Sequence, residues 1–273
     1  MLELSTPQVM GILNVTPDSF SDGGQWNQLD KAIAHAEEML SQGASLLDIG
    51  GYSSRPYADE VSLEEEWDRV GPVLEACRKR FPEALISVDT FRPEIASRAI
   101  ESGAHIINDI KAGLAEPDHA MMEVVAKAQD VPYIMMHMQG EISNMQDNPQ
   151  YQDVCATVWD FFVERMDTAR AMGVRDLVID PGFGFGKSFA HNYQLLGKLD
   201  RLAQLGAPVL VGISRKSMMY KLLETTPQDV LPETSLLHGL ALERGAHILR
   251  VHDVKQAVRA VTLITKMQEY GAI

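Results

Sequence analysis

The chain has 273 residues, 45% of them hydrophobic and 23% charged, and a formal net charge of -14 at pH 7. This length allows one large domain or two small ones with a substantial core, and an acidic chain without a basic patch argues against general nucleic-acid binding. No apolar stretch approaches the ~20 residues of a membrane span, and the N-terminus lacks a basic region followed by an apolar segment, so we expect a cytoplasmic protein that does not bind membranes.

Strand-like apolar runs alternate with segments of helical period along the whole chain. The predicted strands cover residues 8–14, 45–49, 84–89, 105–108, 131–137, 176–180, 208–212 and 246–250. The predicted helices cover 27–41, 62–80, 93–102, 117–128, 151–172, 190–204, 216–243 with a break near Pro227 and Pro232, and 253–270. This alternation, without a linker, predicts a single (β/α)8 barrel domain over residues 1–273, with a doubly wound open sheet as the alternative.

Local signals mark the ends of several predicted helices. Ser62 precedes three acids, Glu64–Glu66, which is typical of a helix N-cap. Glycines follow four helical segments, as expected of C-terminal stops: Gly43, Gly103, Gly173 and Gly245. Cys77 and Cys155 lie within helical patterns, so we expect reduced thiols and no disulfide.

Polar residues end five of the predicted strands. The run Leu177–Ile179 leads into Asp180, and a loop with three spaced glycines then reaches Lys187. Four other apolar runs end in the same way, at Asn14, Asp48, Asp89 and Asn108. A lone Asp-Pro-Gly is equally consistent with a tight turn into a helix. The repetition instead predicts that polar groups from several parallel strands converge on one mouth, where barrel enzymes have their active sites.

Cations stand in three of the segments at or after strand ends. Gly50–Pro56 combines hydroxyls with one arginine, and Ser214–Ser217 places two cations between two hydroxyls. Both patterns suit an anionic group such as a carboxylate or a phosphate. Arg250 and His252 lie two residues apart, which puts them on the same side of a strand, where the pair can hold a phosphate. A solvated arginine and a structural histidine are the alternatives that the residues alone leave open.

In order along the chain, seven segments resemble the motifs of the dihydropteroate synthase family. They span essentially the whole chain: Gly11–Gly24, Gly50–Pro56, Ser87–Thr90, Ile107–Ile110, Asp180–Lys187, Ser214–Ser217 and Arg250–Asp253. Members of that family are (β/α)8 barrels, usually homodimers, that join 6-hydroxymethyl-7,8-dihydropterin diphosphate to p-aminobenzoate and release diphosphate. The resemblance therefore implies small-molecule substrates, Mg2+ as cofactor and a homodimer.

The resemblance also implies roles for individual residues. The expected pterin contacts are Asp89, Asn108 and Asp180, with Lys216 beside the ring and Ile110 and Met136 as apolar walls. The expected diphosphate contacts are Asn14, Arg250 and His252, with Asn14 also on Mg2+. The expected p-aminobenzoate contacts are Ser54, Arg55, Pro56, Phe185 and Ser217. The residues expected to act in catalysis are Asp89, Asp22, Lys216, Arg250 and His252.

The reaction that the resemblance implies is a dissociative substitution. Diphosphate leaves the pterin methylene before the arylamine attacks, while Asp89 stabilises the carbocation and Asp22 accepts from the amine. The chain departs from the family pattern at Tyr52 and Ser54, where many members have Glu and Thr, and this bears on sulfonamide affinity more than on the reaction. A pterin-binding methyltransferase-type domain and a non-catalytic pterin-binding protein are the alternative functions.

Overall fold

The protein is a closed barrel of parallel strands in a computed structural model that describes residues 3–16, 25–52, 61–115 and 117–271. The strands are β1 (Gln8–Asn14), β2 (Leu46–Gly50), β3 (Leu85–Asp89), β4 (Ile106–Asp109), β5 (Tyr133–Met136), β6 (Leu177–Asp180), β7 (Leu210–Val211) and β8 (Ile248–Val251). They pair in the order β6-β5-β4-β3-β2-β1-β8-β7, and an isolated parallel bridge from Ile179 to Val209 joins the two outer strands. This closure confirms the (β/α)8 barrel and rules out the open sheet.

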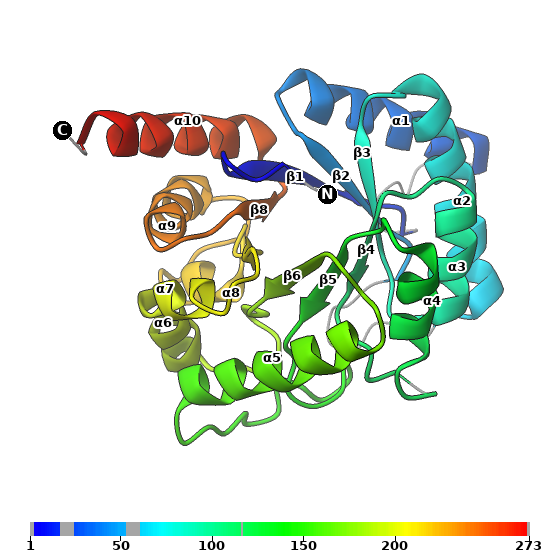
Figure 1. Ribbon diagram of the computed structural model, residues 1–273. Coiled ribbons are helices and arrows are strands. Elements are labelled where there is room, and N and C mark those ends of the chain that lie inside the picture. The colour runs from blue at the N-terminus through cyan, green and yellow to red at the C-terminus, as the bar shows by residue number, and fades with distance from the viewer. Residues whose placement is uncertain (1–2, 17–24, 53–60, 116, 272–273) are drawn as a thin grey trace.

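Helices surround the strands on the outside of the ring (Figure 1). Their bounds are α1 (Gln25–Ser41), α2 (Leu63–Arg80), α3 (Pro93–Glu101), α4 (Ala120–Ala128), α5 (Val154–Ala171), α6 (Phe189–Gly197), α7 (Leu199–Ala203), α8 (Ser217–Tyr220), α9 (Leu231–Glu243) and α10 (Val254–Gly271). The predicted helix 190–204 is two helices, α6 and α7, and the predicted helix 216–243 is α8 and α9. Pro232 lies in the first turn of α9, where its missing N–H has no helical partner to lose, so it helps to begin that helix.

The predicted helix ends are confirmed. The Ser62 hydroxyl accepts the Glu65 N–H at 3.3 Å, and the Glu65 carboxylate accepts the Ser62 N–H at 3.0 Å, which forms a capping box. The four glycines that follow helices have φ between 89° and 100°, the left-handed conformation that a glycine adopts without strain. Cys77 and Cys155 are free and buried.

A small apolar cluster fills the inside of the barrel, separate from the larger core between strands and helices. It takes one residue from each of seven strands: Met10, Leu46, Ile106, Ile134, Val178, Leu210 and Ile248. Because successive side chains of a strand point to opposite faces, the residues two positions further along also point inward. These positions include Asp48, Asn108, Asp180 and Arg250. A polar layer therefore lies directly on top of the apolar one.

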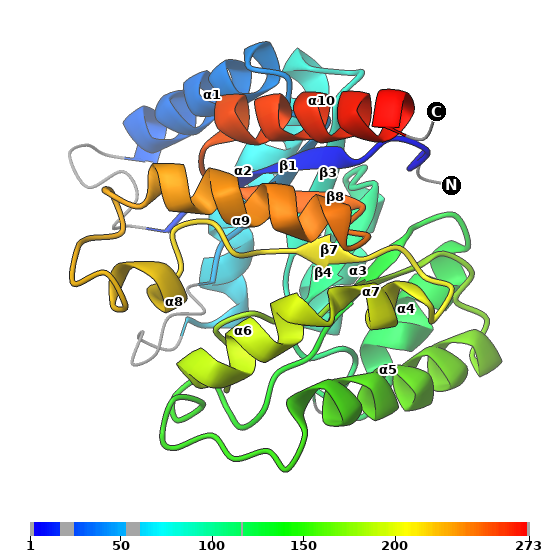
Figure 2. The same ribbon diagram turned by 90° about the vertical axis from the view of Figure 1, so that its left-hand side faces the viewer.

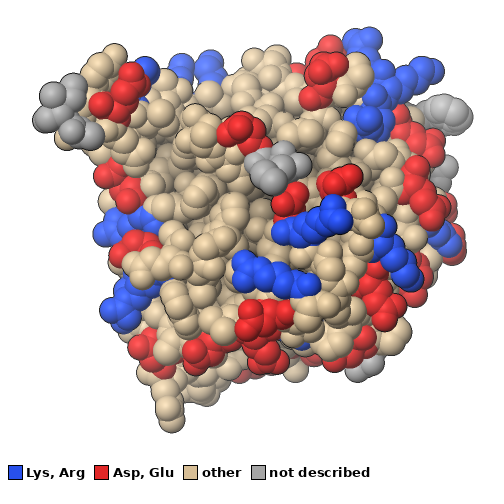
Figure 3. Space-filling view, in the orientation of Figure 1, with Lys and Arg blue, Asp and Glu red and all other residues tan. Residues whose placement is uncertain are grey.

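The polar layer faces the loops that follow the strands. Figure 2 shows both termini at one end of the barrel and α8, which follows the carboxyl end of β7, at the other. The face in Figure 3 carries acidic and basic side chains interspersed, without a broad basic patch. Within the described ranges, no helix is both long and apolar enough to cross a membrane.

The start of the loop after β6 has no room for an added methyl group. Gly182 has φ +67°, and a Cβ atom there would overlap the carbonyl oxygen of His137. We expect Gly182→Ala to lower the free energy of unfolding by at least about 2 kcal/mol, because backbone strain adds to the overlap. Gly197→Ala is the control, since nothing lies within 4 Å of the added methyl, and it should be neutral or stabilising. Equal urea midpoints for the Gly182 variant and the wild type would contradict this expectation.

Candidate active site

Arg250 bridges two carboxylates at the carboxyl ends of the strands. Its Nε donates to Asp48 Oδ2 at 2.6 Å, and its Nη2 donates to Asp89 Oδ2 at 2.7 Å. Asn108 Nδ2 donates to the same Asp48 oxygen at 3.1 Å. Side chains from β2, β3, β4 and β8 thus meet in one network, and the predicted convergence of strand-end residues is confirmed for these positions. Asp48, fully buried at its centre, received no role from the sequence although its place at a strand end was visible.

Two buried polar atoms in and beside this network have no hydrogen-bond partner among the described residues. Among the described residues, Asp48 Oδ1 and Ser87 Oγ are buried and accept or donate no hydrogen bond. Buried polar atoms in folded proteins are nearly always paired, with protein, with water or with a bound molecule. Two such atoms in the layer below the mouth are typical of a site that a ligand or ordered water completes.

Burial changes the ionisation of the groups around the mouth. It raises the pKa of Asp89 to about 7, while the Arg250 guanidinium opposes the rise and the Asp48 carboxylate adds to it. Burial also raises the pKa of Asp180, against the hydrogen bond from the Gly182 N–H. It lowers the pKa of Lys216 to about 8, with Asp180 acting in the opposite direction. Titratable groups shifted toward neutral pH by burial and by charged neighbours are typical of active sites.

Lys216 lies beside the loop that follows β6. Asp180 fixes the start of this loop by accepting the Gly182 N–H at 2.8 Å. Lys216 Nζ donates to the Phe183 carbonyl and stands 4.3 Å from the centroid of the Phe185 ring. A carboxylate, an ammonium group and an aromatic ring therefore border one another, an arrangement that suits a flat molecule with polar edges.

Asn14 faces the same space as Asp89. A methyl group added at Gly50 would lie 3.6 Å from Asn14 Oδ1 and 3.7 Å from Asp89 Oδ2. The absence of a side chain at Gly50 thus leaves room between an amide oxygen and a carboxylate oxygen. Both are hard oxygen donors of the kind that Mg2+ prefers.

His252 and Arg215 form hydrogen bonds with residues of neighbouring loops. His252 Nδ1 lies 3.3 Å from Ser214 Oγ, which also accepts the His252 N–H at 3.2 Å. Burial, with Arg250 and Arg215 nearby, lowers the pKa of His252 to about 4, so its ring is neutral at pH 7. Arg215 donates to Asp253 from Nε at 2.8 Å and from Nη2 at 2.5 Å. Of the two cations from which we predicted an anion site in this segment, Arg215 is thus paired with Asp253, while Lys216 lies beside the Phe185 ring.

The other predicted site residues divide into two groups. Met136 and Ile110, the expected apolar walls, are buried, and Ser217 is the first residue of α8. The remaining four, Asp22, Ser54, Arg55 and Pro56, lie outside the described residues. Their roles stay predictions.

Tyr52, one of the departures from the family pattern, belongs to an aromatic and cationic cluster. Its ring packs edge-on against Phe91 with 5.1 Å between centroids, and the Arg92 guanidinium lies 5.4 Å from the Tyr52 centroid. Arg92 is itself paired with the buried Glu66 at 2.7 Å. Tyr52 thus packs at the start of the second loop through its aromatic ring, which contacts Phe91 and the Arg92 guanidinium.

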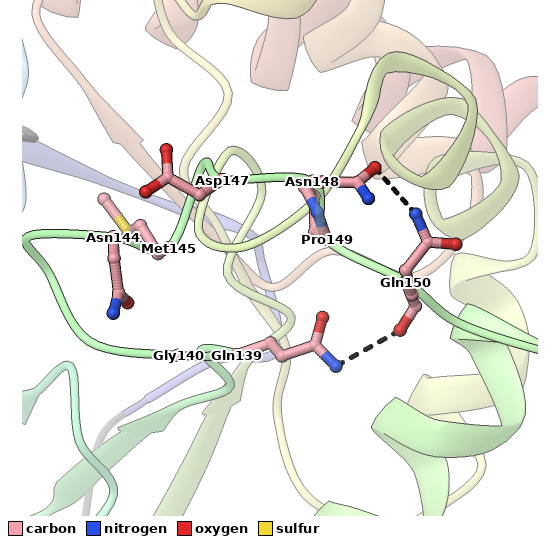
Figure 4. A pocket seen from close by; sticks show the side chains of 8 residues that line it. All are labelled: Gln139, Gly140, Asn144, Met145, Asp147, Asn148, Pro149 and Gln150. Carbon is pink, nitrogen blue, oxygen red and sulfur yellow. Dashed lines mark hydrogen bonds between the residues drawn. The ribbon is translucent and has the colours of Figure 1, made fainter.

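The loop between β5 and α5 lines an open pocket (Figure 4). Its volume is 370 Å³, and it is lined by Gln139, Gly140, Asn144, Met145, Asp147, Asn148, Pro149 and Gln150. The side-chain amide of Gln146 in this loop donates to the carbonyl of Gly184. The predicted strand 131–137 and helix 151–172 leave a loop here, for which the sequence indicated no function. The hydrogen bond from Gln146 shows that this loop supports the loop after β6.

Comparison with known proteins places these features in a family. A family model described as pterin binding enzyme matches residues 10–252. Dihydropteroate synthase of Escherichia coli (strain K12) is 48% identical over 265 residues, which cover 96% of this chain and 92% of the relative. The structure of Yersinia pestis dihydropteroate synthase with a sulfonamide drug complex has a TM-score of 0.91 at 49% identity, covering 98% of this chain and 96% of that one.

The structure of a third relative is known in two separate complexes, each with a different ligand. Xanthomonas albilineans dihydropteroate synthase with 4-aminobenzoic acid has a TM-score of 0.90 at 46% identity, covering 98% of this chain and 95% of that one. Its complex with 7,8-dihydropteroate has a TM-score of 0.87 at 44% identity, with the same coverage. The family match runs from within β1 to the residue after β8, so the likeness includes the barrel and its mouth. This chain therefore belongs to the dihydropteroate synthase family, a family of transferases.

Proposed function

We propose that this chain condenses 6-hydroxymethyl-7,8-dihydropterin diphosphate with p-aminobenzoate to give 7,8-dihydropteroate and diphosphate. The observation that carries the proposal is the Arg250 network, which gathers carboxylates and an amide from four strands at the barrel mouth. Relatives solved with 4-aminobenzoic acid and with 7,8-dihydropteroate support the same substrates. A cytoplasmic location belongs to the proposal.

The pterin ring would bind along the polar layer. A pterin presents ring N–H and amino donors on one edge, and Asp89, Asn108 and Asp180 offer oxygen acceptors. Arg250 engages Asp89 Oδ2, which leaves Oδ1 for a donor of the ring. Lys216, beside Phe185, would lie against one side of the ring system.

The diphosphate would bind where cationic and oxygen groups meet. Two of the nitrogens of Arg250 are engaged by carboxylates, so the diphosphate would meet Nη1, together with neutral His252. Mg2+ fits here because Asn14 Oδ1 and the carboxylate of Asp89 border one open space, and this ion completes its shell with water and phosphate oxygens. When bound, it would neutralise charge on the departing diphosphate.

The p-aminobenzoate would bind above the pterin site. Phe185 and Ser217 are the described residues of this expected pocket, and they come from the loop after β6 and the start of α8. An aromatic ring and a hydroxyl match the flat face and the carboxylate of this substrate. Ser54, Arg55 and Pro56 are the further contacts that we propose.

The chemistry that we propose is dissociative. The bond between the pterin methylene carbon and the diphosphate oxygen breaks with its electron pair going to diphosphate, and the amine nitrogen then bonds the carbon and loses a proton. Asp89 stabilises the positive charge on the pterin, and Asp22 is the proposed acceptor for the amine. Electrostatic stabilisation of this kind needs neither a covalent intermediate nor a strong base.

We also propose a homodimer formed through α9 and α10. These helices lie side by side and enclose a groove between Leu236 and Gly239 on α9 and Leu263 and Ile264 on α10. Leu236 and Leu263 are 65% and 71% exposed. Large apolar side chains in a continuous exposed patch are typical of an interaction surface, and the family resemblance implies that the partner is a second copy.

The reaction itself is tested with purified protein, dihydropterin diphosphate and Mg2+, with and without p-aminobenzoate. We expect dihydropteroate, identified by mass, and an equal amount of diphosphate only when both substrates are present. Chelation of Mg2+ should slow the reaction. Pterin binding without condensation would instead indicate a pterin-binding methyltransferase-type domain or a non-catalytic pterin-binding protein.

Asp89→Asn tests the pterin and carbocation site. The substitution keeps the shape of the side chain and removes the charge, so we expect kcat/KM to fall by about 100-fold or more, the usual effect of losing one such electrostatic contact. Asp200→Asn, on the exposed surface of α7, is the matched control and should be unchanged. A kcat/KM within about twofold of the wild type in Asp89→Asn would refute the assignment.

Leu263→Glu tests the proposed dimer. A carboxylate on the apolar part of this groove would lose its hydration on burial in the interface, so we expect the variant to be a monomer by light scattering where the wild type is a dimer. Leu222→Glu is the control, because Leu222 is 58% exposed and lies after α8, away from this groove. A dimer that survives Leu263→Glu would show that another surface is used.

A further inference from the structure

Lys187 is a buried cation held by four uncharged partners. Its side chain is 3% exposed, and Nζ donates to the carbonyls of Gly182 at 2.9 Å, Phe185 at 3.0 Å and His137 at 3.2 Å. His137 Nδ1 lies 2.9 Å from the same nitrogen. Burial, with Lys187 adding to it, lowers the pKa of His137 to about 2, so this ring is neutral and its Nδ1 is placed to accept.

Burying a lysine ammonium group at this position costs free energy. Removal from water disfavours the ammonium form, and burial lowers the pKa of Lys187 to about 7, with Asp180 opposing the change and Lys216 adding to it. A methionine of similar length would fill the same volume without that penalty. A methionine could not form the hydrogen bonds of Nζ, so these bonds are the physical advantage of a lysine at this position.

These hydrogen bonds tie together two backbone segments that approach each other closely at glycines. Gly182, Gly184 and Gly186 all have positive φ, at +67°, +82° and +62°. A Cβ at Gly182 would overlap the His137 carbonyl oxygen, and one at Gly186 would overlap the Gln139 carbonyl oxygen. The loop after β6 and the segment after β5 thus touch backbone to backbone, and Nζ of Lys187 bonds to carbonyls of both.

The same loop is bound by a second lysine. Lys216 Nζ donates to the carbonyl of Phe183 and lies 4.3 Å from the Phe185 ring centroid. The carbonyls of Gly182 and Phe185 accept from Lys187. Of the two carbonyls between them, that of Phe183 accepts from Lys216 and that of Gly184 accepts from Gln146. The ammonium groups of Lys187 and Lys216 therefore both hold the backbone of residues 182–185, and together they fix the position of Phe185.

We propose that Lys187 is a positioning residue that fixes the Gly182–Gly186 loop so that the Phe185 ring stands against Lys216, and that it thereby sets the affinity for the aromatic amine substrate. The assignment of that substrate rests on the proposed function. Of the expected pterin contacts, Asp180 and Lys216 adjoin this loop. Asp89 and Asn108 come from strands that Lys187 does not contact, so the pterin half of the site should depend on Lys187 less than the p-aminobenzoate half does.

Kinetics of Lys187→Met test the proposal. We expect the KM for p-aminobenzoate to rise at least about tenfold, while kcat and the Kd of 6-hydroxymethylpterin stay within about threefold of the wild type. Lys198→Met, an exposed lysine just after α6, is the matched control and should be unchanged. An unchanged KM, or a loss confined to kcat, would overturn the proposal.

Amide hydrogen exchange of Phe183–Gly186 tests the positioning role without any substrate. We expect exchange in this segment to be at least about tenfold faster in Lys187→Met, with β3 unchanged. Exchange equal to that of the wild type would overturn the proposal. If the wild type makes no dihydropteroate, the proposed function fails, while the exchange rates still decide whether Lys187 holds the loop.

His137→Phe keeps the test decisive if Lys187→Met does not fold. It removes the Nδ1 partner and preserves an aromatic ring against Phe161, which lies 4.9 Å away between centroids. The three carbonyl partners of Nζ remain, so we expect a smaller rise of about threefold in the KM for p-aminobenzoate and faster loop exchange. Wild-type values for both would overturn the proposal.

Discussion

The guanidinium group of Arg250 is the contact on which the polar end of the barrel depends. Asp48, Asp89 and Asp180 point into one small volume, where buried like charges repel and lose their hydration. Arg250 offsets this for two of them through bonds of 2.6 and 2.7 Å. Removing one partner of a buried pair typically costs about 3–5 kcal/mol. The Arg250 guanidinium, which would contact the diphosphate, thus also stabilises the buried carboxylates that would bind the pterin.

The two halves of the proposed site are built differently. The pterin half consists of strand residues such as Asp89 and Asn108, whose directions are fixed by the sheet and by the apolar layer beneath. The other half consists of loop residues such as Phe185, which depend on glycine backbone contacts and on two lysines. Rigid strands suit recognition of a ring edge, whereas a loop allows the second pocket to be adjusted without disturbing the barrel.

Much of the fold could be predicted because its signals are local. The capping box at Ser62 and the glycine stops need only neighbours along the chain, and the polar ends of the strands follow from period-two alternation. The break predicted within 216–243 is confirmed, because α8 ends at Tyr220 and α9 begins at Leu231, and Pro232 lies in the first turn of α9. The structure also showed that Arg215 pairs with Asp253, 38 residues away, which no sequence pattern indicates.

The sequence by itself determined the barrel class and the family, because strand ends and motifs consist of residues that are neighbours along the chain. It also supplied the residues that we propose for the chemistry. Only the tertiary structure decided how those groups pair: that Asp48 is the hub of the mouth, that Lys216 lies against Phe185, and that Lys187 is buried among carbonyls. Partners such as Arg250 and Asp48, 202 residues apart, become neighbours only because β8 and β2 both pair with β1, one on either side.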